Sequence, residues 1–191
     1  VSRDVEDFAK EWEHEENRLL QNMENVLAEP YNYSNRMVST IDYIDQETIS
    51  QKIVLFTNYK ETLEKYALVL QSYFGEEQVA LFHKRMDSDD LELNIYRFQN
   101  EPQCRILLCD ETGGEGRNLQ IADIVIHIDL PWDANAIEQR IGRLDRLGRE
   151  EDRTVLSVVV HTSRTLEGEL YKFWKDGLGV FHKSLSGLEI I

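Results

Sequence analysis

The sequence is short of positive charge, and this shortage limits how the protein can bind its partners. Its 191 residues include 21 lysines and arginines against 36 aspartates and glutamates, so the formal net charge is −15 at pH 7. A chain this acidic does not hold nucleic acid through its bulk charge. Any contact with a polyanion therefore has to come from a local cluster of basic residues.

Long apolar runs and cysteines are also scarce. No stretch approaches the roughly 20 apolar residues of a membrane-spanning helix, and the first residues form no apolar signal core. Cys104 and Cys109 are the only cysteines and lie in one apolar run; we expect core thiols and a cytoplasmic location. Val1 stands where an initiator methionine would, so a fragment of a longer protein is one expectation and processing is another.

From Gln51 onward, short apolar runs alternate with helix-like segments, which is typical of an α/β domain. The runs are KIVLF, QVALF, CRILLC, DIVIHIDL and TVLSVVV. Such runs indicate strands buried on both faces, and right-handed crossovers make the sheet doubly wound and mostly parallel. We expect flanking helices at the N-terminus and three regions: a helical arm or linker over 1–50, the core over 51–163, and a C-terminal helical extension packing on it over 164–191.

Positive charge is concentrated in one segment, IEQRIGRLDRLGRE, in which arginine recurs at every third position from Arg140 to Arg149. Helical spacing places Gln139, Arg143 and Arg146 on one face and apolar side chains on the other. A planar guanidinium that cannot lose its charge suits a polyphosphate. The alternative is an amphipathic helix whose basic face is solvated and tied to nearby carboxylates.

A glycine-rich turn, DETGGEGRNLQ, follows the third apolar run. Glycines there allow a ligand to approach the backbone closely, although an ordinary tight turn is the simpler interpretation. Leu119 stands where the third glycine of a dinucleotide motif would be, and no GxxxxGK[ST] phosphate loop occurs in the chain. The sequence thus has arginines suited to a triphosphate without the loop that would hold one.

Four of these segments, taken in order, resemble the second RecA-like lobe of superfamily-two helicases and translocases. They are KIVLFTNY, ALFHKRM…YRFQN, ETGGEGRNLQIAD and EQRIGRLDRLGR. The last two have the form of motifs V and VI, and together at this spacing they are specific to that superfamily. The resemblance is to the SWI/SNF-type group and to bacterial RapA (HepA) in particular, and it implies a RecA-like fold.

The resemblance also implies a role for each residue that matches a motif. Arg143 and Arg146 would be arginine fingers that reach the γ-phosphate of ATP, and Gln139 would join their polar network. The residues expected against the nucleotide are Gly114, Glu115, Gly116 and Asn118. Those expected against nucleic acid are Thr112, Gly113, Lys84 and Arg85, although RapA has an acidic residue and a glycine in place of the last two.

By the same resemblance, the first RecA-like lobe of the same parent chain would hold most of the ATP and Mg²⁺. The isolated chain would then be inactive, and its partner would be nucleic acid, with duplex DNA expected. RNA polymerase or another DNA-bound complex is the expected object of remodelling, and no membrane is involved. Neither a protein metal site nor a catalytic histidine is expected, because His83, His127 and His161 lack metal-ligand spacing and indicate buried, hydrogen-bonded side chains.

Two other functions stay open at this point. The chain could be a RecA-like interaction or regulatory module whose arginine helix binds an acidic partner, or a self-contained nucleotide-binding domain that binds ATP alone. Two tryptophans carry structural expectations. Trp132, after Pro131, is expected to anchor the strand-to-helix loop, and Trp174 to pack a flanking helix.

Overall fold

The computed structural model describes residues 13–22, 35–48, 51–112, 117–145 and 154–181. The chain folds as two units, Val1–Val38 and Ser39–Ile191. In the first unit, residues 13–22 are helical and exposed, and Arg18 forms an ion pair with Glu15 at 2.8 Å. No helix in the described stretches is long and apolar enough to cross a membrane.

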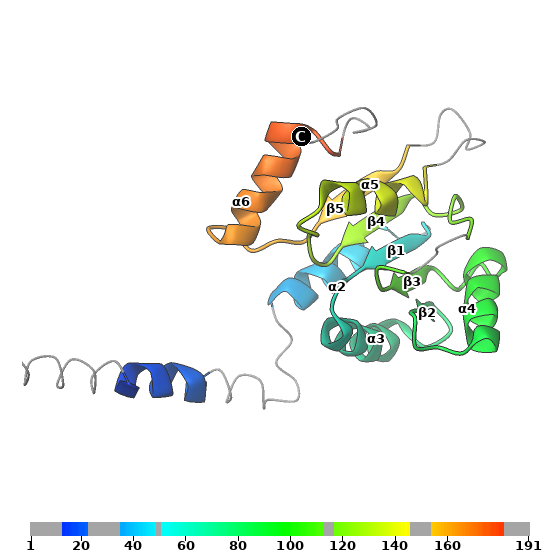
Figure 1. The fold of residues 1–191 in the computed structure, drawn as a ribbon. Coiled ribbons are helices and arrows are strands. Elements are labelled where there is room, and N and C mark those ends of the chain that lie inside the picture. The colour runs from blue at the N-terminus through cyan, green and yellow to red at the C-terminus, as the bar shows by residue number, and fades with distance from the viewer. Residues whose placement is uncertain (1–12, 23–34, 49–50, 113–116, 146–153, 182–191) are drawn as a thin grey trace, which may run out of the picture. The chain divides into compact units, whose positions relative to one another are not determined.

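The second unit is built around a parallel sheet of five strands in the order β2-β3-β1-β4-β5 (Figure 1). The strands are β1 (Ile53–Phe56), β2 (Val79–Phe82), β3 (Ile106–Cys109), β4 (Ile124–His127) and β5 (Leu156–Val159). In register, Ile53 of the central strand β1 lies opposite Ile106 and Ile124. Each of the five apolar runs in the sequence therefore forms a strand, and the predicted parallel sheet is confirmed.

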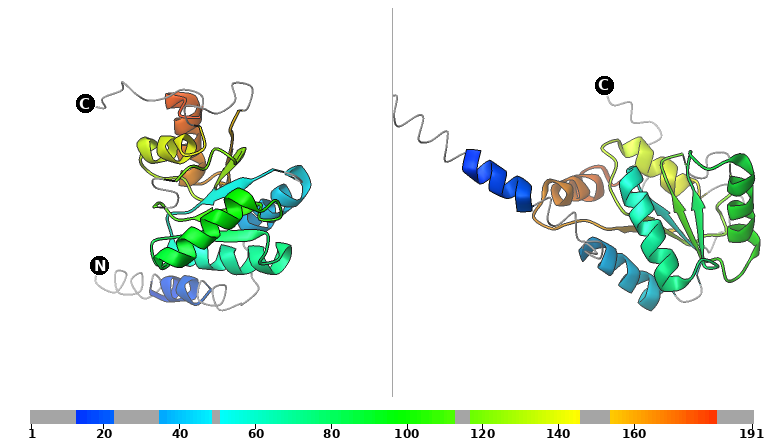
Figure 2. Two further views of the ribbon diagram at one scale, coloured as in Figure 1. Left: turned by 90° about the vertical axis from the view of Figure 1, so that its right-hand side faces the viewer. Right: turned by 90° about the horizontal axis from the view of Figure 1, so that it is seen from below.

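Helices cover both faces of the sheet, as predicted (Figure 2). They are α2 (Asn35–Glu47), α3 (Lys60–Phe74), α4 (Ser88–Asn100), α5 (Ala134–Gly142) and α6 (Leu166–Lys172), and α6 continues into the π-helical turn η1 (Phe173–Leu178). On one face, Val54 and Phe56 pack with Phe98 of α4 and with Leu144, just after α5. The chain runs from β1 over β3 to β2 and then back to β3, so right-handed crossovers place α3 and α4 on opposite faces.

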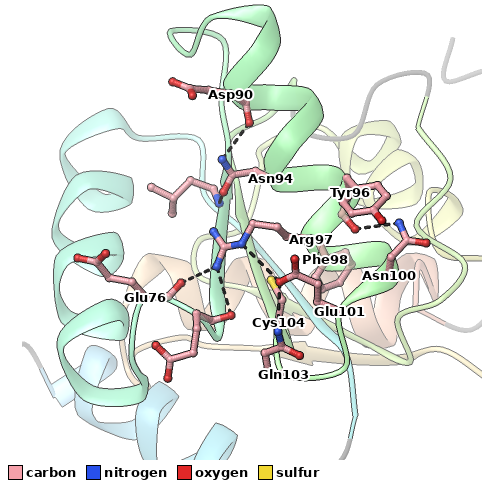
Figure 3. Close-up of polar contacts among 12 residues, drawn as sticks. Glu76, Asp90, Asn94, Tyr96, Arg97, Phe98, Asn100, Glu101, Gln103 and Cys104 are labelled. Carbon is pink, nitrogen blue, oxygen red and sulfur yellow. Dashed lines mark hydrogen bonds and ion pairs between the residues drawn. The ribbon is translucent and has the colours of Figure 1, made fainter.

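Helix α4 also protects the edge strand β2 (Figure 3). Asn94 accepts a hydrogen bond from the backbone N–H of Leu81 at 3.1 Å, and Arg97 donates to the Glu76 carbonyl at 2.9 Å. The N-cap Asp87 accepts from the N–H of Asp90 at 2.9 Å. A strand N–H that is paired with a side chain offers no template to another chain.

After β5, the described chain ends with α6, η1 and a left-handed glycine. Thr165 caps α6 by accepting from the N–H of Gly168, and Gly179 ends η1 at φ +67°. A helix was expected in this segment, and α6 is that helix. Together with Val180, this segment packs against the loop before α5 and against α5 itself. The boundaries that we predict at residues 50 and 163 stay predictions.

Candidate functional site

A pocket of about 510 Å³ opens beside the carboxyl ends of β1, β3 and β4. The residues that line it are Asn58, Glu111, Thr112, Pro131, Trp132, Asp133, Ala136, Gln139, Arg140 and Arg143. Ligands of open parallel sheets bind beyond these strand ends. We call this the arginine pocket.

Gln139 and Arg143, predicted to act together, both line the arginine pocket. The Arg143 Nη2 atom donates to the carbonyl of Glu111 at 3.0 Å, and the guanidinium lies 5.6 Å from the ring centre of Phe56. Helix α5 ends at Gly142, so Arg143 caps the helix and is not an interior residue of it. Arg146 lies outside the described residues. The lining thus presents the Arg143 guanidinium and the Gln139 amide together with a second arginine and a second amide.

Arg140 has a different position from Arg143, and the sequence alone predicts no role for it. The side chain is buried, and it donates to the Asp129 carbonyl at 2.9 Å and to Oδ1 of Asn58 at 2.6 Å. Its Nη2 lies 3.5 Å from Oδ1 of Asp129. Helical spacing could have indicated this burial. Arg140 follows Ile137 by three residues, so it lies at the border of the apolar face of the helix. Burial lowers the pKa of Arg140, while Asp129 opposes that shift.

Asp129 joins the ends of two strands to α5. Its carboxylate accepts from the Thr57 hydroxyl and from the backbone N–H of Asn58, the latter at 3.1 Å, in addition to pairing with Arg140. A buried carboxylate is tolerated when it is paired and its lone pairs are satisfied. The result is a buried network that holds α5 against β1 and β4, and so holds the pocket wall that carries Gln139 and Arg143.

His127 completes this buried network as a neutral ring. Burial, and then the charge of Arg140, lowers its pKa to about 3. Its Nδ1 lies 3.4 Å from Nη1 of Arg140, and its Nε2 lies 3.0 Å from the hydroxyl of Ser157. An arginine can only donate, so Nδ1 accepts and the proton is on Nε2. The prediction that His127 is a buried, hydrogen-bonded histidine is confirmed.

Lys84 and Arg85 lie in a second, smaller pocket of about 120 Å³, which we call the lysine pocket. Nζ of Lys84 is 3.7 Å from Oε1 of Glu111, and Nη1 of Arg85 is 3.6 Å from Oε1 of Glu64. All four side chains are about half exposed or more. Asn58 and Glu111 line this pocket as well as the arginine pocket.

The other predicted site residues have different positions. Thr112 lines the arginine pocket and donates to Asp110 through its N–H and its hydroxyl, at 3.0 and 2.6 Å. Asn118 is not among the residues lining either pocket; its Oδ1 accepts from the N–H of Gln120 at 2.9 Å. The residues predicted at the glycine turn lie outside the described part of the chain: Gly113, Gly114, Glu115 and Gly116.

Side chains that could bind a metal ion do not cluster in the described stretches. They contain no group of three or more His, Cys, Asp or Glu side chains placed to hold a metal ion. His83, which lines the lysine pocket, has its pKa lowered, first by burial.

The two tryptophans near the arginine pocket do not behave alike. Trp132 is 67% exposed, so the prediction that its side chain anchors the strand-to-helix loop is wrong. Trp174 holds that loop instead, because its buried indole N–H donates to the Pro131 carbonyl at 3.3 Å. The prediction that Trp174 packs a flanking helix is confirmed, because it is 7% exposed and packs against Ala134 and Ile137.

A family model described as the helicase conserved C-terminal domain matches residues 35–148, more than half of the chain. The chain is also similar to the Sulfolobus solfataricus SWI2/SNF2 ATPase core solved in complex with dsDNA, with a TM-score of 0.63 and 22% identity over 83% of this chain and 33% of that one. It is similar to domain 2 of the DEAD-box helicase Mss116p bound to an RNA duplex, with a TM-score of 0.62 and 19% identity over 78% of this chain and 58% of that one.

A third similar structure is the C-terminal part of the Fun30 ATPase domain, with a TM-score of 0.59 and 20% identity over 83% of this chain and 53% of that one. At these identities the similarity shows the fold. This chain spans less than two thirds of the length of each of the three structures.

Proposed function

The chain belongs to the family of helicase conserved C-terminal domains, and from this premise we propose that it is the second lobe of a nucleic-acid-stimulated ATPase. In this proposal it completes an ATP site whose phosphate-holding loop is on a first RecA-like lobe. The observation that carries it is that Arg143 and Gln139 line one pocket at the carboxyl edge of the sheet, on a wall held by a buried ion pair.

The chemistry of the arginine pocket fits the phosphate end of a nucleotide. Arg143, Gln139 and Thr112 are donors that line it, and Arg143 donates to a backbone carbonyl that a phosphate oxygen can replace. ATP supplies the phosphoryl group, and Mg²⁺ is held mainly by the first lobe. A guanidinium that reaches the γ-phosphate stabilises the charge that develops on the transferred group, which is the arginine-finger role. Arg146 is proposed as the second finger, with Gly114, Glu115, Gly116 and Asn118 toward the nucleotide.

The proposed track is duplex DNA, bound through its backbone without base reading. Lys84 and Arg85 are exposed and form ion pairs at 3.6–3.7 Å, which are weak in water and can exchange a carboxylate for a phosphate. Thr112 and Gly113 are proposed as further phosphate contacts. Two similar structures contain a nucleic-acid duplex, one of DNA and one of RNA. We propose that the parent protein translocates along the duplex rather than separating its strands. It would be a cytoplasmic SWI/SNF-type protein like RapA, and it would displace RNA polymerase or another DNA-bound complex.

The test is ATP hydrolysis by the full-length protein with and without duplex DNA, comparing wild type with Arg143→Ala. Loss of an arginine finger is expected to lower kcat by on the order of 10³-fold, while the folded state survives because Arg143 is on the pocket wall. Arg18→Ala is the matched control, since Arg18 is an exposed arginine of the first unit. Equal turnover by wild type and Arg143→Ala would refute the proposal and favour an interaction module that binds an acidic partner.

A further inference from the structure

Helix α5 and the loop before it contact different parts of the molecule on two sides. One side lines the arginine pocket, through Trp132, Gln139 and Arg143 among others. The opposite side is buried: Ala134 and Ile137 are at most 2% exposed and pack against the chain that follows α6. We call residues 166–181 the C-terminal brace. A displacement of the brace therefore shifts the wall of the pocket, because a packed interface transmits movement.

Trp174 makes the most direct contact between the brace and this wall. Its Nε1–H donates to the carbonyl of Pro131, and Pro131 itself lines the arginine pocket next to Trp132. The hydrogen bond is buried, so a carbonyl that loses this donor is left unsatisfied, which costs free energy. Two residues after Pro131, the Asp133 side chain caps α5 by accepting from the N–H of Asn135. The bond thus holds the chain just before the start of α5.

The backbone around Trp174 is held at the same time. The Trp174 carbonyl accepts from the N–H groups of both Gly179 and Val180, where the π-helical turn closes on a left-handed glycine. π-helical turns are rare and are frequent at functional positions. The turn thus holds the backbone of Trp174, and the Pro131 carbonyl holds its indole.

A second contact runs from the brace to the buried network. The Phe181 ring packs edge-on to His127 with centres 6.1 Å apart, and Tyr171 lies 6.0 Å from Phe181. His127 in turn faces Arg140, whose ion pair with Asp129 holds α5. The brace therefore contacts the pocket wall at the start of α5 and also contacts the network that holds the C-terminal half of α5.

We propose that Trp174 is a positioning residue for the arginine pocket: the C-terminal brace, through the Trp174–Pro131 hydrogen bond, sets the position of α5 and so aims Arg143 and Gln139. This inference rests on the proposed function. A group that acts on the transition state changes kcat when it is misplaced and leaves substrate binding alone. A shift of 1 Å can lower turnover by about 100-fold.

The test in the full-length protein is Trp174→Phe, which keeps an aromatic ring and removes the N–H donor. We expect kcat for DNA-stimulated ATP hydrolysis to fall by about 10-fold to 100-fold, with KM for ATP unchanged. The control is Leu166→Ala, at the start of α6, because Leu166 is 69% exposed. In an Arg143→Ala background, Trp174→Phe is expected to have a smaller effect on kcat, since one of the two groups that it aims is gone.

A measurement without ATP completes the test. Amide hydrogen exchange over Ala134–Gly142 is expected to be faster in Trp174→Phe and unchanged over Ser88–Asn100 of α4. Unchanged exchange in α5, or the same loss of kcat with and without Arg143, would overturn the positioning role. Failure of the proposed function gives a different result. The kcat of Arg143→Ala then equals that of the wild type, and the effect inferred for Trp174 on kcat is refuted as well.

Discussion

Arg140 and Asp129 form a buried ion pair behind the arginine pocket, whereas Lys84 and Glu111 form an exposed one at the lysine pocket. The nitrogen–oxygen distances are nearly equal, at 3.5 and 3.7 Å. The two pairs differ in exposure. The side chains of the first pair are 4% and 9% exposed, and those of the second pair are 58% and 61% exposed. Two ion pairs of the same length at the same edge of a sheet therefore have different energetics.

The comparison shows which charges are structural and which can exchange partners. A buried charge that loses its partner is left in a medium of low dielectric constant, so the pair must stay together. An exposed pair contributes little, because water and salt replace either partner. We therefore interpret the Arg140 network as the support for the pocket wall and the ion pairs of the lysine pocket as exchangeable.

The largest expected effect comes from breaking the buried pair. Arg140→Met should lower the free energy of unfolding by about 3–5 kcal/mol, because the Asp129 carboxylate is left buried and unpaired. Chemical denaturation of the 191-residue chain measures it. Adding Asp129→Asn should recover part of the loss, since it removes the buried charge and keeps an acceptor for Thr57 and Asn58. A loss below about 1 kcal/mol would show that Asp129 does not depend on Arg140.

Acidification should weaken the buried region by a smaller amount. Unfolded His127 binds a proton below about pH 6.5, whereas in the folded state its pKa is about 3. The unfolded state therefore binds more protons between these values, and stability falls as the pH is lowered. Between pH 7 and pH 5 this one group should account for about 2 kcal/mol. The difference between wild type and His127→Gln in denaturation at both pH values isolates it; parallel pH profiles would contradict the assignment.

The smallest effect on stability is expected at the lysine pocket. Lys84→Met and Arg85→Met should each change the free energy of unfolding by less than about 0.5 kcal/mol, because their ion pairs are exposed. Duplex binding by the full-length protein should weaken instead, and the slope of log affinity against log salt should drop by about 1 for each lysine or arginine removed. An unchanged slope would remove both residues from the proposed DNA surface.

The sheet could be predicted from the sequence because apolar runs of four or five residues, buried on both faces, leave little alternative. The site was harder, since Arg140 and Arg143 belong to one three-residue repeat and look alike in sequence. What separates them is Asp129, which lies just after β4 and pairs with Arg140; helical spacing along α5 does not reveal this partner. The prediction for Trp132 was wrong for the same reason. Its position after a proline does not reveal that Trp174, 43 residues after Pro131, is the tryptophan that holds the loop.

Glu111 links the two pockets. Its carboxylate pairs with Lys84, while its backbone carbonyl accepts from Arg143. If a ligand that draws either cation away shifts this shared residue, the two sites are thermodynamically linked. Linkage is reciprocal: if a ligand at Arg143 changes the affinity at Lys84 by some factor, a ligand at Lys84 changes the affinity at Arg143 by the same factor. A single glutamate can thus communicate occupancy in both directions across the edge of the sheet.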